Sequence, residues 1–521
     1  MRQTVEMTNT TVASAAKKVS PLAVPLLGLL AAIQGAGPNI SSTALIGASR
    51  GLHMDAATQA LAASTQTLAI AASVITTGLL ADRLGRRKVL VSALLLSIVG
   101  NLVIMAAANP EMYIAGQVLT GVGLGATYAA AFAYIQVVAK PGKVAGAMGT
   151  FAAVCGLFTI VFTFAGGTLA SSDWRLAFLV VPVMAAIAIL LVLVLLPTIA
   201  PLPATKHDVW GQVFLAAGLV SLLYGVSHLA DSLTSLSTWM PIIAGLALIA
   251  LFVITQAKVK HPFFPVALFK NPIFIAAILA GFIYNFGQSV AFLQLTNLWQ
   301  YILELKTSEV SMWQLPLLFA GIVSAVIFGR LMSRGMSNQA ALLSGSVISA
   351  LGFFVLYISR DGKDFMAFLP GGLLVGAGII VASLPYGTLI LSQAPKEFFG
   401  PVTSSRTTFG QLFYSIGLAV SSVFIDQLTL GGVTKKLLAA GVPADQVGTG
   451  IDAVNAYASA GTKPTDAIGA QALSAAHDSY VTAYGTLMFG TGVLILVAGF
   501  VAYMLIRRGL AAKSAAAPAA A

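Results

Sequence analysis

Charged residues are scarce in this 521-residue sequence: Asp, Glu, Lys and Arg together make up 9% of it, and hydrophobic residues make up 58%. Soluble globular chains contain about 25% charged residues. The low charge, the mean hydropathy of +0.91 and repeated apolar runs of about 20 residues exclude a soluble protein. We therefore expect an all-α polytopic membrane protein.

Cysteines and clustered histidines are lacking too. Cys155 is the one cysteine and lies inside an apolar run, which excludes a disulfide framework and a multi-cysteine metal site. The five histidines are widely scattered, without His-Glu-x-x-His or a similar spacing. No nucleophile–base pair and no soluble domain support catalysis. We expect no cofactor, no metal and no enzymatic activity.

Acidic residues are fewer than basic ones, 17 against 28, and the formal charge is +11. In a soluble protein such an excess would suggest a nucleic-acid partner. In a membrane protein, basic residues gather in the cytoplasmic loops and orient the chain. We expect no nucleic-acid partner.

The apolar runs predict fourteen membrane helices, so both termini lie on one side of the membrane. With the termini inside, twenty of the 28 basic residues fall on the inner side and eight on the outer side, which is a positive-inside bias. We therefore expect cytoplasmic termini. The predicted spans are 21–47, 57–80, 89–108, 112–138, 144–171, 176–197, 209–231, 239–257, 272–300, 309–333, 338–358, 365–393, 401–427 and 479–505.

The longest predicted connection is the outer loop 428–478. Pro464-Thr465-Asp466 within it is typical of a helix start, and we expect the last helix to extend above the membrane. Two roles stay open for this loop: a structural cap, which we favour, and a ligand gate.

The connection between the second and third spans reads GLLADRLGRRK, residues 78–88, with one carboxylate and four basic residues in positions 82–88. Glycines and cations in this pattern are typical of a tight cytoplasmic turn between two membrane helices. The stretch resembles the signature loop between helices 2 and 3 of the major facilitator superfamily.

Further segments resemble the fourteen-helix drug:proton antiporter branch of that superfamily. They are SSDWRLAFLVVPV (171–183), HPFFPVALFKN (261–271), LTNLWQYILELKTSEVSMWQLPLLFAG (295–321) and SSRTTFGQLFYSIGLAV (404–420). The resemblance implies the major facilitator fold, in which one six-helix bundle rocks on the other about a midplane site. The implied divisions are a cytoplasmic tail at 1–20, an N-terminal six-helix bundle at 21–200, two inserted linker helices at 201–260, a C-terminal six-helix bundle at 261–505 that includes the loop 428–478, and a cytoplasmic tail at 506–521.

The resemblance also implies a conformational latch in the helix-2/3 loop. Asp82 is expected to bind the N-terminus of the span 401–427, where the helix dipole stabilises a negative charge. Arg83 or Arg406 is expected to add a charge-assisted bond. The predicted latch residues are Gly78, Asp82, Arg83, Gly85, Arg86 and Arg87.

Carboxylates are lacking near the midpoint of every predicted span. The antiporter branch usually carries an Asp in helix 1, an Arg in helix 4 and Gly-Pro-x-x-Gly-Gly in helix 5. This sequence has Gly37, Gln117 and FTFAGG (162–167) in those regions. A proton carrier would therefore have to lie at an outer helix end, and the candidates are Asp231, Glu304, Asp426 and His228.

Amide and hydroxyl side chains are found in the spans where relatives keep charges. A single group of this kind usually holds helices together, and that alternative stays open for each of them. Together they predict a polar, largely uncharged central cavity that suits a neutral, zwitterionic or anionic amphiphile. The candidate substrate-binding residues are Gln34, Asn39, Gln66, Gln117, Tyr284, Asn285, Gln288, Asn297, Gln411 and Tyr414.

These observations predict a secondary active transporter that exports small amphipathic compounds, drugs or metabolites, across a bacterial inner membrane by alternating access. The alternative is an uptake transporter or facilitator for a neutral or anionic solute, without proton antiport. The expected partners are a small-molecule substrate, membrane lipids and, if transport is coupled, protons. We expect a monomer.

Overall fold

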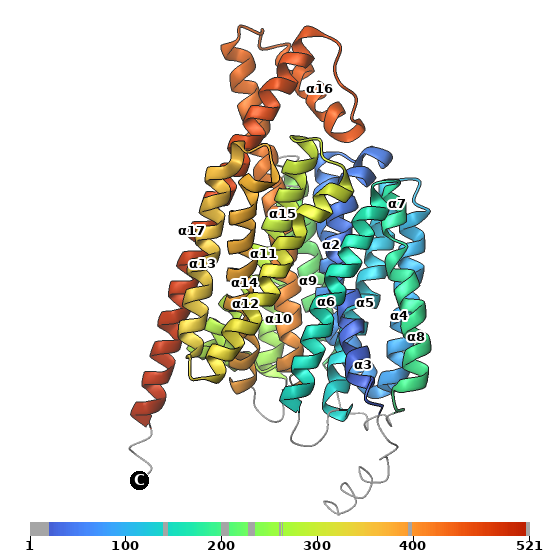
Figure 1. The fold of residues 1–521 in the computed structure, drawn as a ribbon, viewed down its shortest axis with the longest axis vertical. Helices are drawn as coiled ribbons and strands as arrows, with labels where there is room; N and C mark the ends of the chain where they lie inside the picture. Colours follow the sequence, from blue (N-terminus) through green and yellow to red (C-terminus); the bar gives the residue numbers. More distant parts are fainter. Residues whose placement is uncertain are drawn as a thin grey trace, which may run out of the picture.

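The computed structural model is a bundle of long, roughly parallel helices with a small helical cap at one end (Figure 1). It describes residues 20–138, 144–198, 208–227, 235–259, 262, 264–393 and 399–516. We call the end that carries the cap the cap end, and the other end the tail end. No strand occurs in these described ranges.

Helices cover all fourteen of the predicted spans, although α7 and α8 share the sixth. Eleven helices of the described residues are long and apolar enough to cross a membrane, and the number of crossings stays a prediction. The elements are α2 (Ala23–Leu52), α3 (Ala56–Leu84), α4 (Arg86–Met105), α5 (Pro110–Val138), α6 (Val144–Ala170), α7 (Trp174–Ala177), α8 (Val180–Leu195), α9 (Val209–Ser227), α10 (Leu236–Lys258), η2 (Val266–Lys270), α11 (Pro272–Tyr301), α12 (Thr307–Ser333), α13 (Asn338–Ile358), η3 (Ser359–Asp361), α14 (Phe365–Gln393), α15 (Phe399–Ala439), α16 (Val447–Ala460) and α17 (Ala467–Ala516).

Short polar side chains cap the N-termini of several of these helices. Asp55 accepts a hydrogen bond of 2.8 Å from the backbone N–H of Thr58 at the start of α3. Asn271 accepts one of 2.9 Å from the N–H of Ile273, and the first residue of α11 is a proline. Such caps satisfy backbone donors that have no partner inside the helix, and proline at the first position loses no bond.

Buried apolar side chains form a main core in each half of the bundle, and the first core also reaches Leu293 of α11 and Leu418 of α15. Helices α2 to α8 enclose the first core, which includes Leu30 and Tyr113. Helices α11, α12, α13, α14, α15 and α17 contribute to the second, which includes Phe292, Phe353 and Tyr484. Helices α9 and α10 pack on each other, and α9 contacts both α3 and α15. Two helical bundles therefore meet along α3 and α15, with α9 beside the junction.

Within each bundle, small residues let helices approach closely. A Cβ atom on Gly100 of α4 would lie 2.5 Å from the backbone nitrogen of Thr120 on α5. A Cβ atom on Gly345 of α13 would lie 2.2 Å from the backbone nitrogen of Ala382 on α14. Without a hydrophobic effect between helices in lipid, such close packing is a main source of helix association.

The cap is formed by the ends of two long helices and by α16. Helix α15 continues to Ala439, and α17 begins at Ala467, directly after the predicted helix start. Asp466 caps α17 by accepting a 2.8 Å hydrogen bond from the N–H of Gly469. Lys436 forms an exposed 3.2 Å ion pair with Asp478, which joins α15 to α17.

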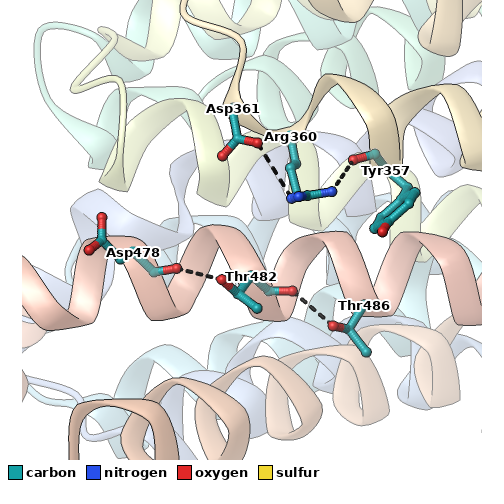
Figure 2. Close-up of polar contacts among 6 residues, drawn as sticks. All are labelled: Tyr357, Arg360, Asp361, Asp478, Thr482 and Thr486. Atoms are coloured by element: carbon teal, nitrogen blue, oxygen red, sulfur yellow. Dashed lines mark hydrogen bonds and ion pairs between the residues drawn. The ribbon is translucent and has the colours of Figure 1, made fainter. Parts of the chain in front are cut away.

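Helix α17 has 50 residues and runs from the cap through the length of the bundle (Figure 1). Hydroxyl side chains along it bond to the helix itself. Thr482 and Thr486 each donate 2.9 Å hydrogen bonds to the carbonyl four residues earlier (Figure 2). Polar side chains satisfied in this way do not interrupt a helix that enters a membrane.

Candidate functional site

Polar side chains from both bundles meet along α2, α3 and α15, and we call these contacts the seam. Thr67 of α3 and Ser415 of α15 share a hydrogen bond of 2.5 Å between buried hydroxyls. The Tyr414 hydroxyl donates to Oδ1 of Asn39, on α2, at 3.4 Å. These bonds join residues about 350 positions apart, so the seam exists only in the folded protein.

Two further bonds link the bundles nearer the cap end. Gln59 of α3 donates from Nε2 to the Tyr301 hydroxyl of α11 at 3.1 Å. Gln300 donates from Nε2 to the carbonyl oxygen of Thr43 at 3.3 Å. The two bundles are therefore joined by hydrogen bonds from the seam toward the cap end.

Several amide atoms at the seam are buried without a hydrogen-bond partner among the described residues. They are Nδ2 of Asn39, Oε1 of Gln66 and Oε1 of Gln411. Gln66 lies beside Gly37, where a Cβ atom would be 3.0 Å from Nε2 of Gln66. Buried polar atoms are nearly always paired with protein or water, so these atoms indicate where a water molecule or a solute binds.

Gln117 is placed differently from the seam amides. Its Nε2 donates to the Ser41 hydroxyl at 2.5 Å and to the Tyr113 hydroxyl at 2.9 Å. All three residues belong to the N-terminal bundle, and Gln117 is fully buried. These contacts are typical of a polar group that holds membrane helices together, and a role in substrate binding stays a prediction.

The remaining candidates of the substrate set lie on α2 and α11. Gln34 is buried, and Asn297 is 8% exposed, near the cap end of α11. Asn285 donates from Nδ2 to the Gly281 carbonyl at 2.8 Å. Tyr284 and Gln288 are half-buried.

Arg406 of α15 is a half-buried cation within the C-terminal bundle. Its guanidinium carbon lies 5.2 Å from the centre of the Tyr386 ring, and its Nε is buried without a hydrogen-bond partner among the described residues. Its charge also acts on the hydroxyls of Tyr128 and Tyr284. Sequence reasoning treated Arg406 as a partner of Asp82 rather than as part of the substrate set, although a cation in a membrane helix is itself a functional signal.

The predicted latch loop is the turn from α3 to α4. Gly85 has a φ of +97°, a conformation that favours glycine, and so permits the sharp turn between the two helices. Arg87 donates to the Thr198 hydroxyl, beyond α8, at 3.1 Å and to the carbonyl of Leu193 near the end of α8. Arg86 is half-buried. The structure does not describe the side chains of Asp82 and Arg83 or the surroundings of Gly78.

A cavity of about 470 Å³ lies at the cap end, lined by the turn between α2 and α3 and by residues of α3, α11, α15, α16 and α17. Its volume is in the range of small-molecule sites. Five polar atoms on its wall are buried without a hydrogen-bond partner among the described residues: Oε1 of Gln294, Oδ1 of Asn297, Oγ1 of Thr429, Nε2 of His477 and the Tyr480 hydroxyl. Asp426, a predicted proton carrier, is also part of this wall.

Sequence reasoning did not identify the residues that hold the cap over this cavity. The Arg50 guanidinium carbon, on α2, lies 5.6 Å from the ring centres of both Tyr301 and Tyr457. From the sequence, Arg50 is one of the eight basic residues on the outer side. Its contact with a ring on α16 could not be predicted, because the two residues are far apart in the sequence.

Glu304 lies between α11 and α12 and accepts hydrogen bonds from Lys463 at 3.2 Å and from the Tyr457 hydroxyl at 3.3 Å. The hydrogen bond and charge of Lys463, with the bond from Tyr457, lower the pKa of this exposed carboxyl. A lowered pKa keeps Glu304 ionised near neutral pH, which disfavours proton carriage there. Asp231 and His228 lie outside the described residues.

Comparison with known proteins gives matches over most of the chain. The sequence model of the family described as "Major Facilitator Superfamily" matches residues 27–418. A "Multidrug resistance protein B homolog" of Mycobacterium tuberculosis (strain CDC 1551 / Oshkosh) is 28% identical over 378 residues, which cover 71% of this chain and 70% of that protein. The "Multidrug transporter protein MdtP" of Bacillus subtilis (strain 168) is 28% identical over 372 residues, or 69% of this chain and 67% of that protein. The "Lincomycin resistance protein LmrB" of the same strain is 25% identical over 420 residues, or 78% and 86%.

Solved structures give the same fold. A bacterial homolog of the human lysosomal transporter Spinster, in an inward-facing and unoccupied conformation, matches with a TM-score of 0.64 and 14% identity over 95% of this chain and 98% of that one. An auto-inhibited POT family peptide transporter matches with a TM-score of 0.60 and 16% identity over 94% and 97%. At these identities the likeness shows the fold alone.

Proposed function

This chain belongs to the Major Facilitator Superfamily, and from this premise we propose that it exports small amphipathic compounds by alternating access. Family membership makes it a multi-pass membrane transport protein rather than an enzyme. The relatives named for multidrug transport or drug resistance support efflux. We place it in the inner membrane of a bacterial cell, as a monomer.

The seam is the observation that carries this proposal. Rocking of the bundles has to break the Thr67–Ser415 and Asn39–Tyr414 hydrogen bonds, each of which contributes about 0.5–1.5 kcal/mol. Contacts of this strength can be exchanged during a transport cycle. The unpartnered atoms of Asn39, Gln66 and Gln411 then offer hydrogen bonds to a cargo that enters between the bundles.

The proposed topology fixes which end of the bundle faces the cytoplasm. With the termini in the cytoplasm, fourteen crossings put the tail end inside and the cap end outside, in keeping with twenty of 28 basic residues on the inner side. Cargo leaving the seam would then pass the cavity beneath the cap. Gly78, Asp82, Arg83, Gly85, Arg86 and Arg87 would form the inner latch.

Transport by the purified chain in proteoliposomes tests the proposal. The cargo to try first is radiolabelled lincomycin, since one relative is named for resistance to it, together with a panel of amphipathic drugs. We expect movement of at least one compound, and a lower apparent affinity in Gln411→Ala. The matched control is Gln314→Ala: its Oε1 also lacks a partner among the described residues, but its Nε2 donates to the Thr296 hydroxyl at 2.6 Å within its own bundle. A folded protein that moves none of the compounds would contradict the proposal.

A second candidate is transport without proton coupling, as an uptake system or facilitator. Two observations favour it: the described residues place no carboxylate at the seam, and Glu304 is bound to Lys463. An imposed pH gradient separates the two candidates. Cargo accumulation that follows the gradient supports antiport, and accumulation that ignores it supports the uncoupled mechanism.

A further inference from the structure

Arg406 is a cation in a part of α15 that is apolar enough to cross a membrane. No ion pair joins it to a carboxylate among the described residues, and its Nε is buried without a hydrogen-bond partner there. A hydrogen bond joins Arg406 to the Tyr128 side chain, but it supplies no negative charge. A buried charge without a counter-charge is costly, and an ionisable residue within a membrane segment usually marks a functional site. Its position therefore needs a ligand of opposite charge or access to water.

One tyrosine ring lies beside this cation, and the charge of the cation reaches two further tyrosines. The Tyr386 hydroxyl of α14 donates to the Arg406 backbone carbonyl at 2.6 Å, and the Tyr386 ring lies 5.2 Å from the guanidinium carbon. The charge of Arg406 acts on the hydroxyls of Tyr128, on α5, and Tyr284, on α11. The guanidinium is therefore held where side chains of both bundles converge.

The position is also reachable. Tyr386 is 2% exposed, but Arg406, Tyr128 and Tyr284 each keep part of their surface exposed. Gly410 lies one turn after Arg406, on the same face of the helix. It packs close to the Asn285 amide: a Cβ atom placed on Gly410 would lie 3.1 Å from Nδ2 of Asn285. A cation, phenol hydroxyls, an aromatic ring and an amide thus lie around one partly open position.

We propose that Arg406 binds the anionic group of the cargo, and that the cargo is an amphiphile with one carboxylate or similar anion on an aromatic body. This inference rests on the proposed export function and names its substrate class. A guanidinium can bind a carboxylate through two parallel hydrogen bonds. The hydroxyls of Tyr128 and Tyr284 add donors to the same group, since that of Tyr386 already donates to the Arg406 carbonyl, and the aromatic rings cover the apolar body.

Three pyrene compounds with similar aromatic bodies test the proposal: pyrenebutyrate, which is an anion, uncharged pyrenebutanol, and pyrenemethylammonium, which is a cation. Energy transfer from tryptophan to pyrene measures their binding to the full chain in lipid nanodiscs, with empty nanodiscs subtracted. We expect the anion to bind about tenfold more tightly than the alcohol, the effect of one charge-assisted interaction. In Arg406→Gln that preference disappears while alcohol binding stays unchanged, and Arg406→Lys retains part of it.

Two controls make the outcome specific. Arg360 has a comparable cation–ring contact, 4.8 Å from the Tyr357 ring centre, at the end of α13 (Figure 2), and Arg360→Gln should leave all three affinities unchanged. Asp82→Asn tests whether Arg406 instead serves the latch. Loss of the anion preference in Asp82→Asn as large as in Arg406→Gln would overturn the inference.

If Arg406→Gln does not fold, competition on the wild-type protein decides. 2-Naphthoate should displace pyrenebutyrate more effectively than 2-naphthylmethylammonium does, and the reverse order would overturn the inference. Transport separates this result from the parent proposal. Movement of cationic or neutral drugs without any preference for anions leaves export standing and removes the anion site, whereas failure to move any compound removes export itself.

Discussion

The guanidinium carbon of Arg50, on α2, lies 5.6 Å from the centre of the Tyr457 ring, on α16. The same cation lies 5.6 Å from the Tyr301 ring on α11. Gly461 has a φ of +71° and ends α16 in a turn. This turn packs against the Arg50 side chain. One cation of the N-terminal bundle is thus held by two rings of the C-terminal half, and this contact attaches the cap across the junction of the bundles.

Removing this cation should loosen the cap. Cation–π contacts contribute about 0.5–2 kcal/mol each, so Arg50→Gln should increase hydrogen exchange in α16 (Val447–Ala460) several-fold. The matched control is Arg360→Gln, because Arg360 contacts Tyr357 and Asp361 within one connection and links no bundles (Figure 2). Unchanged exchange in Arg50→Gln would show that the cap is held by other contacts.

The Glu304 carboxylate should make this attachment dependent on pH. The Lys463 hydrogen bond and charge lower its pKa below the ordinary 4.5, so its contribution is present above that ordinary value and is lost as pH falls through the lowered one. Glu304→Gln should therefore raise exchange in α16 at neutral pH. Below the lowered pKa, where wild-type Glu304 is protonated as well, the two proteins should converge. A difference that persists at low pH would contradict this assignment.

Gln117 and Gln411 should respond differently to substitution. Gln117→Leu leaves the hydroxyls of Ser41 and Tyr113 without its amide, which should lower the free energy of unfolding by about 1–3 kcal/mol. The Oε1 atoms of Gln117 and Gln411 both lack a partner among the described residues. Gln411→Ala breaks no hydrogen bonds like those of the Gln117 Nε2, so it should change cargo affinity more than stability. Thermal unfolding and transport affinity, measured on both variants, check the contrast. If Gln117→Leu changes affinity at unchanged stability, the amide belongs to the substrate site.

Gly85→Ala should destabilise the turn from α3 to α4. Its φ of +97° disfavours any residue with a Cβ atom, at a cost of about 1–2 kcal/mol. Gly372→Ala is the control, because Gly372 lies inside helix α14 with nothing within 4 Å of its Cβ position, and alanine is favoured there by about 0.5–1 kcal/mol. Chemical denaturation of the two variants measures the difference. Equal stabilities would mean that the turn relaxes without strain.

The sequence predicted helix positions well because membrane helices are set by local properties. A run of about 20 apolar residues must be helical in lipid, where no water satisfies the backbone. The predicted start of the last helix was correct for the same kind of reason: Asp466 caps a helix that begins at Ala467. In contrast, α16 and the continuation of α15 to Ala439 were not predicted, because helices outside the membrane leave a weaker hydrophobic pattern.

Side-chain roles could be predicted less well than helices. By itself the sequence determined a polytopic helical membrane protein with few carboxylates, many amides in its spans and the helix-2/3 motif. Only the tertiary structure decided that Gln117 packs within one bundle, that the Oε1 of Gln411 is buried without a partner among the described residues, and that Arg50 meets Tyr457. The physical reason is that a membrane helix forms from its own residues and the surrounding lipid, whereas a polar side chain gains its role from partners hundreds of positions away.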